Sequence, residues 1–239
     1  MFSITVDPQI RQAIPTLQLG LLEATGISNR AQDPALWTML LELEESLRHT
    51  WGAKGAANHP QIAATRRAYR ALHDDPTRYR PANEALLRRT LTRRALPQIN
   101  VVVDINTFVS LQSGFALGCY DLALLQPPIT VRSGQSGETY APIGKTSVDA
   151  ANRLVLVDQV GIFGSPTADA ERSLVTLNTQ HVLFVIFAFD APGDAVERVL
   201  NQTATLLTQF CNAVIMGQNV LAASEDQTAA VNATSLEQA

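Results

Sequence analysis

The chain lacks most of the short motifs that identify common enzyme classes. It contains no GxxxxGK[ST] phosphate loop, no HExxH zinc motif, no CxxC pair and no GxSxG elbow. These absences argue against P-loop enzymes, zinc proteases and hydrolases with a nucleophile elbow. The two cysteines, Cys119 and Cys211, lie far apart and fit no metal-ligand spacing. They favour reduced thiols over a disulfide framework, which is typical of a cytoplasmic protein.

Long apolar runs are also missing. The run VLFVIFAF at 182–189 is far shorter than the ~20 residues of a membrane span, and its β-branched and aromatic residues are typical of a buried strand. The start, MFSITVDPQI, has no basic segment followed by an apolar run, so we expect no secretory signal. With 239 residues, 46% of them hydrophobic, the chain can form a full core. We expect a single soluble domain with no membrane partner.

Positive charge is concentrated in one segment, although the net charge is −4. Nearly all of this charge is arginine, and only Asp74, Asp75 and Glu84 offset it between positions 66 and 94. Arginines on successive helices can bind phosphates through paired hydrogen bonds, so this pattern indicates an RNA contact. A solvated, arginine-rich helix face is the alternative. The predicted RNA-binding residues are Arg66, Arg67, Arg70, Arg88, Arg89 and Arg93.

Helical periodicity and strand-like runs both occur along the chain. Asp33 is expected to cap a helix that starts at Pro34 and ends near Gly52, and Gly114 is expected to end another. The expected helices cover 34–51, 60–72, 81–91, 101–113 and 193–221. The expected strands cover 2–6, 16–23, 129–131, 153–158, 173–177 and 182–189, the last of them at the centre of a sheet covered on both sides. From Ala222 the sequence is small and polar, which predicts a mobile tail.

Several polar residues are candidates for chemistry, each with a structural alternative. His181, just before the central strand, can orient a water molecule as a general base, or it can simply pack at a strand end. If 173–177 is a strand, hydroxyl groups line one of its faces, although threonine is also a good strand former. The residues of this hydroxyl-bearing cluster are Arg172, Ser173, Thr176 and Thr179.

A second set of candidates surrounds the helix at 101–113. Asn106 offers both a donor and an acceptor for an α-amino or ester group, and Asp121 can hold an ammonium group. Helix capping and turn anchoring are the structural alternatives for both residues. Glu138 flanks a turn and has the same two interpretations. Cys119 is a possible nucleophile, but a buried, inert thiol is the other interpretation.

The run ANEALLRRTL…LPQINVVVDINTFVSLQSGFALGCYD resembles the editing-domain core of the phenylalanyl-tRNA synthetase beta chain, the B-three/B-four domain. The likeness extends from about Tyr79 to Phe189. It implies an α+β fold, a layered β/β/α sandwich with N-terminal helices and a long C-terminal helix. We expect one free-standing domain over residues 1–221, with an N-terminal part at 1–78 and a core at 79–189, and a flexible tail at 222–239.

In the synthetase family, this domain hydrolyses tyrosine wrongly attached to the phenylalanine tRNA. The family's histidine corresponds here to Gly118, and its glutamate falls in the apolar region Phe184 to Phe187. The family's Thr-Asn pair appears in reversed order as Asn106-Thr107. The resemblance therefore leaves two alternatives: the pocket accepts another aminoacyl group, or the module only binds.

The resemblance implies tRNA or aminoacyl-tRNA as the partner, with a free amino acid or related metabolite as the alternative. Ester hydrolysis by a positioned water requires no metal, and we expect no cofactor. The predicted catalytic residues are His181, Thr176 and Asn106. The predicted substrate-binding residues are Asp121, Gly118, Thr107, Arg172, Ser173, Thr179 and Glu138.

Overall fold

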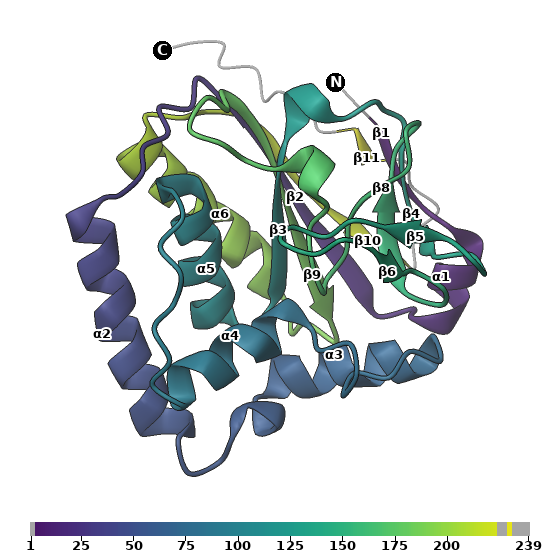
Figure 1. Ribbon diagram of the computed structural model, residues 1–239, viewed down its shortest axis with the longest axis horizontal. Coiled ribbons are helices and arrows are strands. Elements are labelled where there is room, and N and C mark those ends of the chain that lie inside the picture. Colours follow the sequence, from purple (N-terminus) through teal and green to yellow (C-terminus); the bar gives the residue numbers. More distant parts are fainter. Residues whose placement is uncertain (1–2, 224–228, 231–239) are drawn as a thin grey trace.

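The computed structural model describes residues 3–223 and 229–230 (Figure 1). The helices are α1 (Pro8–Ala13), α2 (Pro34–Trp51), α3 (Pro60–Ala71), α4 (Ala82–Leu91), α5 (Val101–Ser113) and α6 (Ala195–Cys211), with 3-10 turns η1 (Ala56–Asn58), η2 (Leu122–Leu124) and η3 (Glu171–Ser173). The strands are β1 (Ser3–Val6), β2 (Leu17–Thr25), β3 (Ala116–Asp121), β4 (Ile129–Ser133), β5 (Thr139–Tyr140), β6 (Val148–Asp149), β7 (Leu154–Val157), β8 (Ile162–Gly164), β9 (His181–Phe189), β10 (Val214–Ala222) and β11 (Ala229–Ala230). Within these residues, no helix has the length and apolar character needed to cross a membrane.

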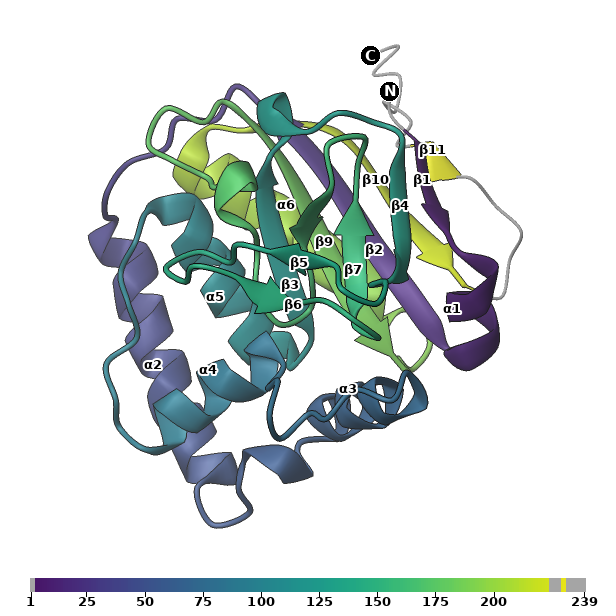
Figure 2. The ribbon, with the colours of Figure 1, turned by 45° about the vertical axis from the view of Figure 1, so that its right-hand side comes forward.

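The elements form three layers. A four-stranded sheet, in the order β10-β2-β9-β3, lies in the middle. Figure 1 shows α2, α4 and α5 on one side of this sheet, and Figure 2 shows the five-stranded sheet β11-β1-β4-β7-β8 on the other. The expected α+β fold with layered β/β/α packing and a long C-terminal helix is confirmed.

Strand β9 is the centre of the middle sheet and contributes to two cores. It pairs in antiparallel fashion with β2 on one side and with β3 on the other. Because side chains alternate along a strand, Phe184 and Ile186 pack into the helix-side core, whereas Leu183, Val185 and Phe187 pack between the sheets. This explains why the run is apolar at every position, and the expected central strand covered on both faces is confirmed.

Local chemistry defines the ends of several helices. The Asp33 carboxylate accepts hydrogen bonds from the backbone N–H groups of Ala35 and Leu36, which caps α2 as expected. Gly114 ends α5 with φ of 74°, a left-handed conformation that favours glycine. Pro81 precedes the first residue of α4 as its N-cap, so the expected start at Pro81 was one residue early.

Two expected elements were wrong. Residues 173–177 do not form a strand, because η3 ends at Ser173 and a hydrogen-bonded turn follows at Thr176. The helix expected over 193–221 ends at Cys211, where Asn212 takes a left-handed φ of 53°. The chain then forms β10, because pairing with the edge of β2 satisfies its backbone groups. Apolar spacing alone did not reveal this change from helix to strand.

Most of the expected tail lies outside the described residues, at 224–228 and 231–239. Within that segment Ala229–Ala230 form β11, which pairs with β1. The division of the chain into a domain at 1–221 and a tail at 222–239 stays a prediction.

Replacing Phe184 with alanine removes a large, fully buried side chain from the helix-side core. We expect the free energy of unfolding to fall by about 3–5 kcal/mol, from lost burial and the cavity left behind. Chemical denaturation monitored by fluorescence measures this change. Leu177→Ala, at a side chain that is 53% exposed, is the control and should change stability by less than ~0.5 kcal/mol. Equal effects of the two substitutions would contradict this packing.

Candidate functional site

Among the residues that the structure describes, no other strand covers the outer edge of β3. It is the last strand of the middle sheet, yet all six of its residues are buried. The backbone groups along such an edge need partners from elsewhere in the protein. The Asn106 side chain of α5 donates to the Leu117 carbonyl over 3.5 Å, and the Cys119 N–H donates to the Asp169 carboxyl group. Asn106, Cys119, Tyr120 and Asp169 together are called the β3 edge cluster below.

Asp169 has an unusual protonation equilibrium. Burial raises the pKa of its carboxyl group to about 7, although the neighbouring Tyr120 hydroxyl and the Cys119 backbone N–H lower the pKa in part. The residue as a whole remains partly exposed to solvent. A carboxyl group with a pKa near 7 exchanges protons readily at neutral pH, which is what a general base requires. Sequence reasoning missed Asp169, since nothing in the segment SPTADA distinguishes it from an ordinary loop residue.

The loop that carries Asp169 is fixed by contacts from three directions. The Tyr140 hydroxyl donates to the carbonyl of Ala168 over 3.2 Å, and the hydroxyl groups of Tyr69 and Thr167 lie 2.7 Å apart. The Pro166 carbonyl accepts a 2.9 Å hydrogen bond from the N–H of Ala82, at the first residue of α4. These contacts position the loop that carries Asp169.

The Tyr120 side chain occupies the space that a side chain at position 118 would need, so that only glycine fits there. A Cβ atom at position 118 would lie 2.0 Å from the Tyr120 hydroxyl oxygen and 2.8 Å from an Asp169 carboxyl oxygen. Gly164 on β8 faces the same tyrosine ring, with 2.3 Å between its would-be Cβ and the hydroxyl oxygen. Both glycines are therefore required by close approach to Tyr120. The resemblance noted in the sequence implies a histidine at position 118, whereas here the Tyr120 side chain, which lies next to the Asp169 carboxyl group, occupies that space.

Asn106, predicted as catalytic, lies at this cluster. Its side-chain oxygen Oδ1 is buried and has no hydrogen-bond partner among the described residues. A buried acceptor without a partner is costly, so it indicates a place for a bound donor. Thr107 follows it on α5 and is buried. Burial raises the pKa of the Cys119 thiol well above its ordinary value, which argues against a role as nucleophile.

Asp121 and Thr179, both predicted to bind substrate, come together inside a turn. The Thr179 hydroxyl donates to the Asp121 carboxylate over 2.6 Å, and the other carboxylate oxygen accepts from the Ala123 N–H over 3.0 Å. Thr179 also accepts a hydrogen bond from the backbone N–H of Thr176. Asp121 and Thr179 are both buried. In this conformation they anchor the turn, and their role in substrate binding stays a prediction.

His181 is the first residue of β9 and pairs with a carboxylate on the neighbouring strand. Its Nε2 lies 2.8 Å from Oε1 of Glu23 on β2, and its side chain is 37% exposed. A histidine with a carboxylate partner and access to solvent has the arrangement expected of a base. Its role as a catalytic residue stays a prediction.

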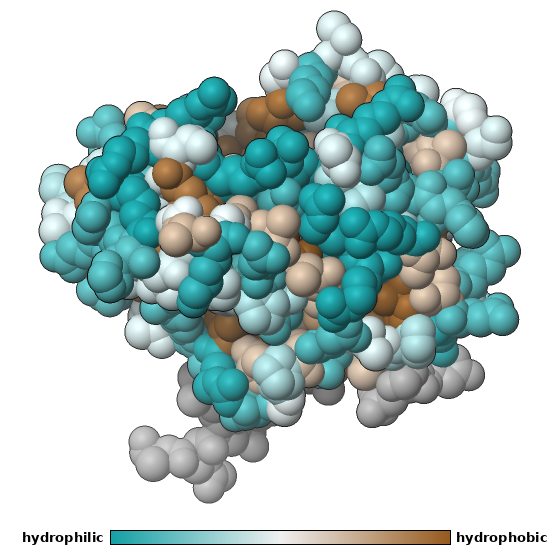
Figure 3. Space-filling view, turned by 90° about the horizontal axis from the view of Figure 1, so that it is seen from below, coloured by the Kyte–Doolittle hydropathy of each residue, from teal (hydrophilic) through white to brown (hydrophobic). Residues whose placement is uncertain are grey.

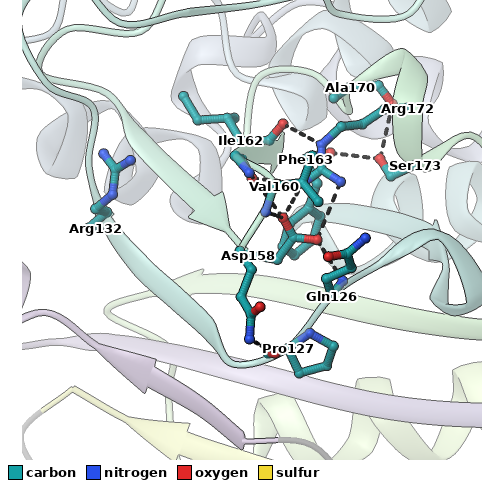
Figure 4. A network of polar contacts seen from close by, with 12 residues as sticks. Gln126, Pro127, Arg132, Asp158, Val160, Ile162, Phe163, Ala170, Arg172 and Ser173 are labelled. Carbon is teal, nitrogen blue, oxygen red and sulfur yellow. Dashed lines mark hydrogen bonds and ion pairs between the residues drawn. The ribbon is translucent and has the colours of Figure 1, made fainter.

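Arg172 and Ser173 belong to a network around Asp158 rather than to a hydroxyl-lined strand (Figure 4). Arg172 Nη2 lies 2.5 Å from Asp158 Oδ1, and its Nε donates to the Ile162 carbonyl over 3.1 Å. The Ser173 hydroxyl donates to the Phe163 carbonyl over 2.7 Å. The expected strand-face arrangement of these residues was wrong.

Glu138, another predicted substrate-binding residue, forms a two-point contact with Arg132. The two distances are 2.6 and 2.8 Å. Hydrogen bonding to the guanidinium group lowers the pKa of Glu138. Its role in substrate binding stays a prediction.

The predicted RNA-binding arginines lie on α3, on α4 and just after α4. Two of those on α3 have acidic partners, with Arg66 at 2.7 Å from Glu84 and Arg67 at 2.6 Å from Asp190. Arg88, Arg89 and Arg93 are exposed. Seen from below, the face that includes α3 carries mostly hydrophilic side chains (Figure 3). Within residues 3–223 and 229–230, no three His, Cys, Asp or Glu side chains gather in a way that could hold a metal ion.

Stability should depend on pH through Asp169. An aspartate ordinarily titrates near 3.8, whereas Asp169 titrates near 7, so the fold favours its protonated form. Protonated Asp169 therefore contributes fully to the free energy of unfolding below about pH 4. This contribution is lost as the pH rises through 7, because the carboxyl group ionises in the folded protein. We expect the free energy of unfolding to fall by more than ~1 kcal/mol over this range in the wild type, and by less in Asp169→Asn.

Denaturant titrations at a series of pH values measure this slope. Asp104, whose pKa burial raises to about 6, accounts for part of the slope that remains in the Asp169→Asn variant. Identical slopes in wild type and Asp169→Asn would show that Asp169 does not titrate as stated.

Comparison with known proteins shows to which domain family this chain belongs. Residues 64–212 match the model of the B3/4 domain. A 115-residue segment is 33% identical to the phenylalanine–tRNA ligase beta subunit of Chromobacterium violaceum and covers 45% of this chain and 14% of that protein. The corresponding subunit of Pectobacterium atrosepticum is 35% identical over 104 residues, which cover 41% of this chain and 12% of that protein. The matched segment thus spans a small part of these curated relatives.

Among solved structures, the chain is similar to an N-terminal fragment of the phenylalanyl-tRNA synthetase beta subunit from Pyrococcus horikoshii. The likeness covers 89% of this chain and 50% of that chain, with a TM-score of 0.46 and 15% identity. The match of residues 64–212 to the B3/4 domain model confirms the resemblance noted in the sequence, and since that model covers more than half of its length, the chain belongs to the B3/4 domain family.

Proposed function

We propose that this protein recognises the aminoacylated end of a tRNA and hydrolyses a mischarged ester there, with Asp169 as the general base. The observation that carries this proposal is the position of the Asp169 carboxyl group at the edge of β3, next to Gly118, Cys119 and Tyr120, where burial raises its pKa to about 7. The matched relatives are beta subunits of phenylalanine–tRNA ligase, which supports a tRNA substrate.

The chemistry requires one proton acceptor and one water molecule. Ionised Asp169 takes a proton from a water molecule as the water oxygen attacks the ester carbonyl. When the tetrahedral intermediate collapses, the C–O bond to the ribose breaks, and protonated Asp169 returns the proton to the leaving ribose oxygen. The products are a free amino acid and a tRNA with a 3′-terminal hydroxyl. No cofactor enters this sequence.

Asn106 is suited to hold the amino acid. Its buried, unpartnered Oδ1 can accept a hydrogen bond from the α-ammonium group of the substrate. Thr107, Gly118 and Asp121 lie on the same two elements, α5 and β3, and complete the proposed binding region. Arg172, Ser173, Thr179 and Glu138 belong to it if the substrate extends beyond this edge. His181, with Thr176 in the preceding turn, is the rival position for the base.

A non-catalytic module that binds RNA or an amino-acid-like metabolite is the second candidate. The observation that favours it is the burial of the Tyr120 hydroxyl and of Asn106 Oδ1, which leaves little room for a reacting ester in this conformation. The two functions differ in whether any ester bond is cleaved.

A deacylation assay with a panel of mischarged tRNAs tests the catalytic proposal. At least one ester should be cleaved above background by the wild type, and the rate should rise with pH through about 7, because Asp169 must be ionised. Asp169→Asn should lower this rate by roughly a hundredfold or more, which is the usual contribution of a general base.

Asp149→Asn, at an exposed carboxylate on β6, is the matched control and should leave the rate unchanged. If His181→Gln abolishes cleavage while Asp169→Asn does not, the base is His181. Absence of cleavage at high protein concentration would favour the binding module instead.

The arginines of α4 should dominate RNA affinity. Changing Arg88 and Arg89 to glutamate reverses two positive charges at exposed positions. We expect tRNA binding to weaken and its dependence on salt concentration to become shallower, because fewer counterions are released. Fluorescence anisotropy at several salt concentrations measures both quantities. An unchanged salt slope would remove this surface from the tRNA contact.

A further inference from the structure

A second polar site lies along α4, away from the β3 edge cluster. A cavity of about 510 Å³ is formed by α4 and the segments that flank it. Four of its lining residues are arginines, and none is acidic. We call it the arginine cavity, and its lining consists of Arg80, Ala85, Leu86, Arg88, Arg89, Thr92, Arg94 and Pro97. Arg80 and Arg94 were not among the arginines that the sequence assigned to RNA contact.

The arginines of this cavity are held in place by the protein itself. Arg89 Nε donates to the Ala95 carbonyl over 2.5 Å, and the Arg94 N–H donates to the Arg89 carbonyl over 3.0 Å. These bonds turn the chain back over the end of α4, so that residues after the helix form one wall. The Arg89 guanidinium is thereby preorganised, which lowers the entropic cost of binding an anion.

Glu84 is a buried carboxylate next to the arginine cavity, and its single negative charge is smaller than the positive charge of the arginines around it. Its side chain is 1% exposed, and Arg80 and Arg88 each lie 3.6 Å from its Oε1. Arg66 lies 2.7 Å from its other oxygen. Three guanidinium groups therefore share one carboxylate. The Arg80 atom that faces Glu84 is its buried Nε, at a distance too long for a hydrogen bond.

The lining fits a phosphate carried by a nucleotide better than a free inorganic ion. Guanidinium groups form paired, charge-assisted hydrogen bonds with phosphate oxygens. Leu86 and Pro97 add apolar surface, against which a ribose or a base can pack. The volume exceeds what a single phosphate group requires, so there is room for the nucleotide attached to it.

We propose that the arginine cavity holds the 5′-terminal phosphate of the same RNA whose aminoacylated 3′ end reaches Asp169. This inference rests on the proposed function. The two ends of a tRNA chain lie together at its acceptor stem, and α4 links the two protein sites. Its first residue, Ala82, is bonded to the Asp169 loop through Pro166. The cavity is lined by Arg80 just before the helix, by residues from Ala85 onward along it, and by Arg94 and Pro97 after it. The helix has 10 residues and spans about 15 Å.

Fluorescence anisotropy with two RNA hairpins tests the proposal. The hairpins share one sequence, with an acceptor-like duplex and a single-stranded 3′ end, and differ in carrying a 5′-monophosphate or a 5′-hydroxyl. We expect the wild type to bind the 5′-phosphorylated hairpin about tenfold more tightly, the effect of one charge-assisted contact. Arg94→Gln and Arg88→Gln should each bring the ratio of the two affinities close to one.

Arg93→Gln is the matched control, because Arg93 is adjacent in sequence but does not line the cavity. It should weaken binding of both hairpins equally and preserve the ratio. Equal affinities of the wild type for the two hairpins, or loss of discrimination in Arg93→Gln, would overturn the proposal. If discrimination persists while no mischarged tRNA is deacylated, the phosphate site stands and the proposed function is wrong.

Discussion

The uncovered edge of β3 is the constraint on which the site depends. An edge strand inside a protein must satisfy its N–H and C=O groups without a neighbouring strand. Here α5 supplies Asn106 and the loop after β8 supplies Asp169. The Cys119 N–H holds the carboxyl group against the strand, and burial there raises its pKa to about 7. One hydrogen-bonding requirement thus brings together the groups that can carry out acid–base chemistry.

Tyr120 explains how this chain departs from the synthetase pattern. Its ring packs edge to face with Phe163, with 4.9 Å between centroids, and its hydroxyl lies over Gly118 and Gly164. A histidine at position 118 would require this tyrosine to move. The apolar run at Phe184 to Phe187 is equally fixed, since it forms the centre of the middle sheet. Neither position carries a titratable side chain in this chain, whereas the Asp169 carboxyl group lies next to Gly118.

Helix α4 serves both sites because its two ends make different contacts. At its start, Ala82 and Asn83 bind the backbone of the Asp169 loop and of Gly114. Farther along, Arg88 and Arg89 face the arginine cavity, with the buried Glu84 behind them. Within this segment, Arg80 and Arg88 pair with the Glu84 carboxylate, and the Arg89 guanidinium binds the Ala95 carbonyl.

The sequence by itself determined the elements whose ends depend on local chemistry. The Asp33 cap, the stop at Gly114 and the doubly buried strand at 182–189 all follow from residue types and their spacing. Tertiary structure alone decided the strand after Asn212, because pairing with β2 outweighs helical spacing. It also decided the role of Asp169, because a pKa depends on burial and on partners about 50 residues away along the chain. Spacing along a sequence records neighbours within a few residues, whereas the site is made by contacts between distant segments.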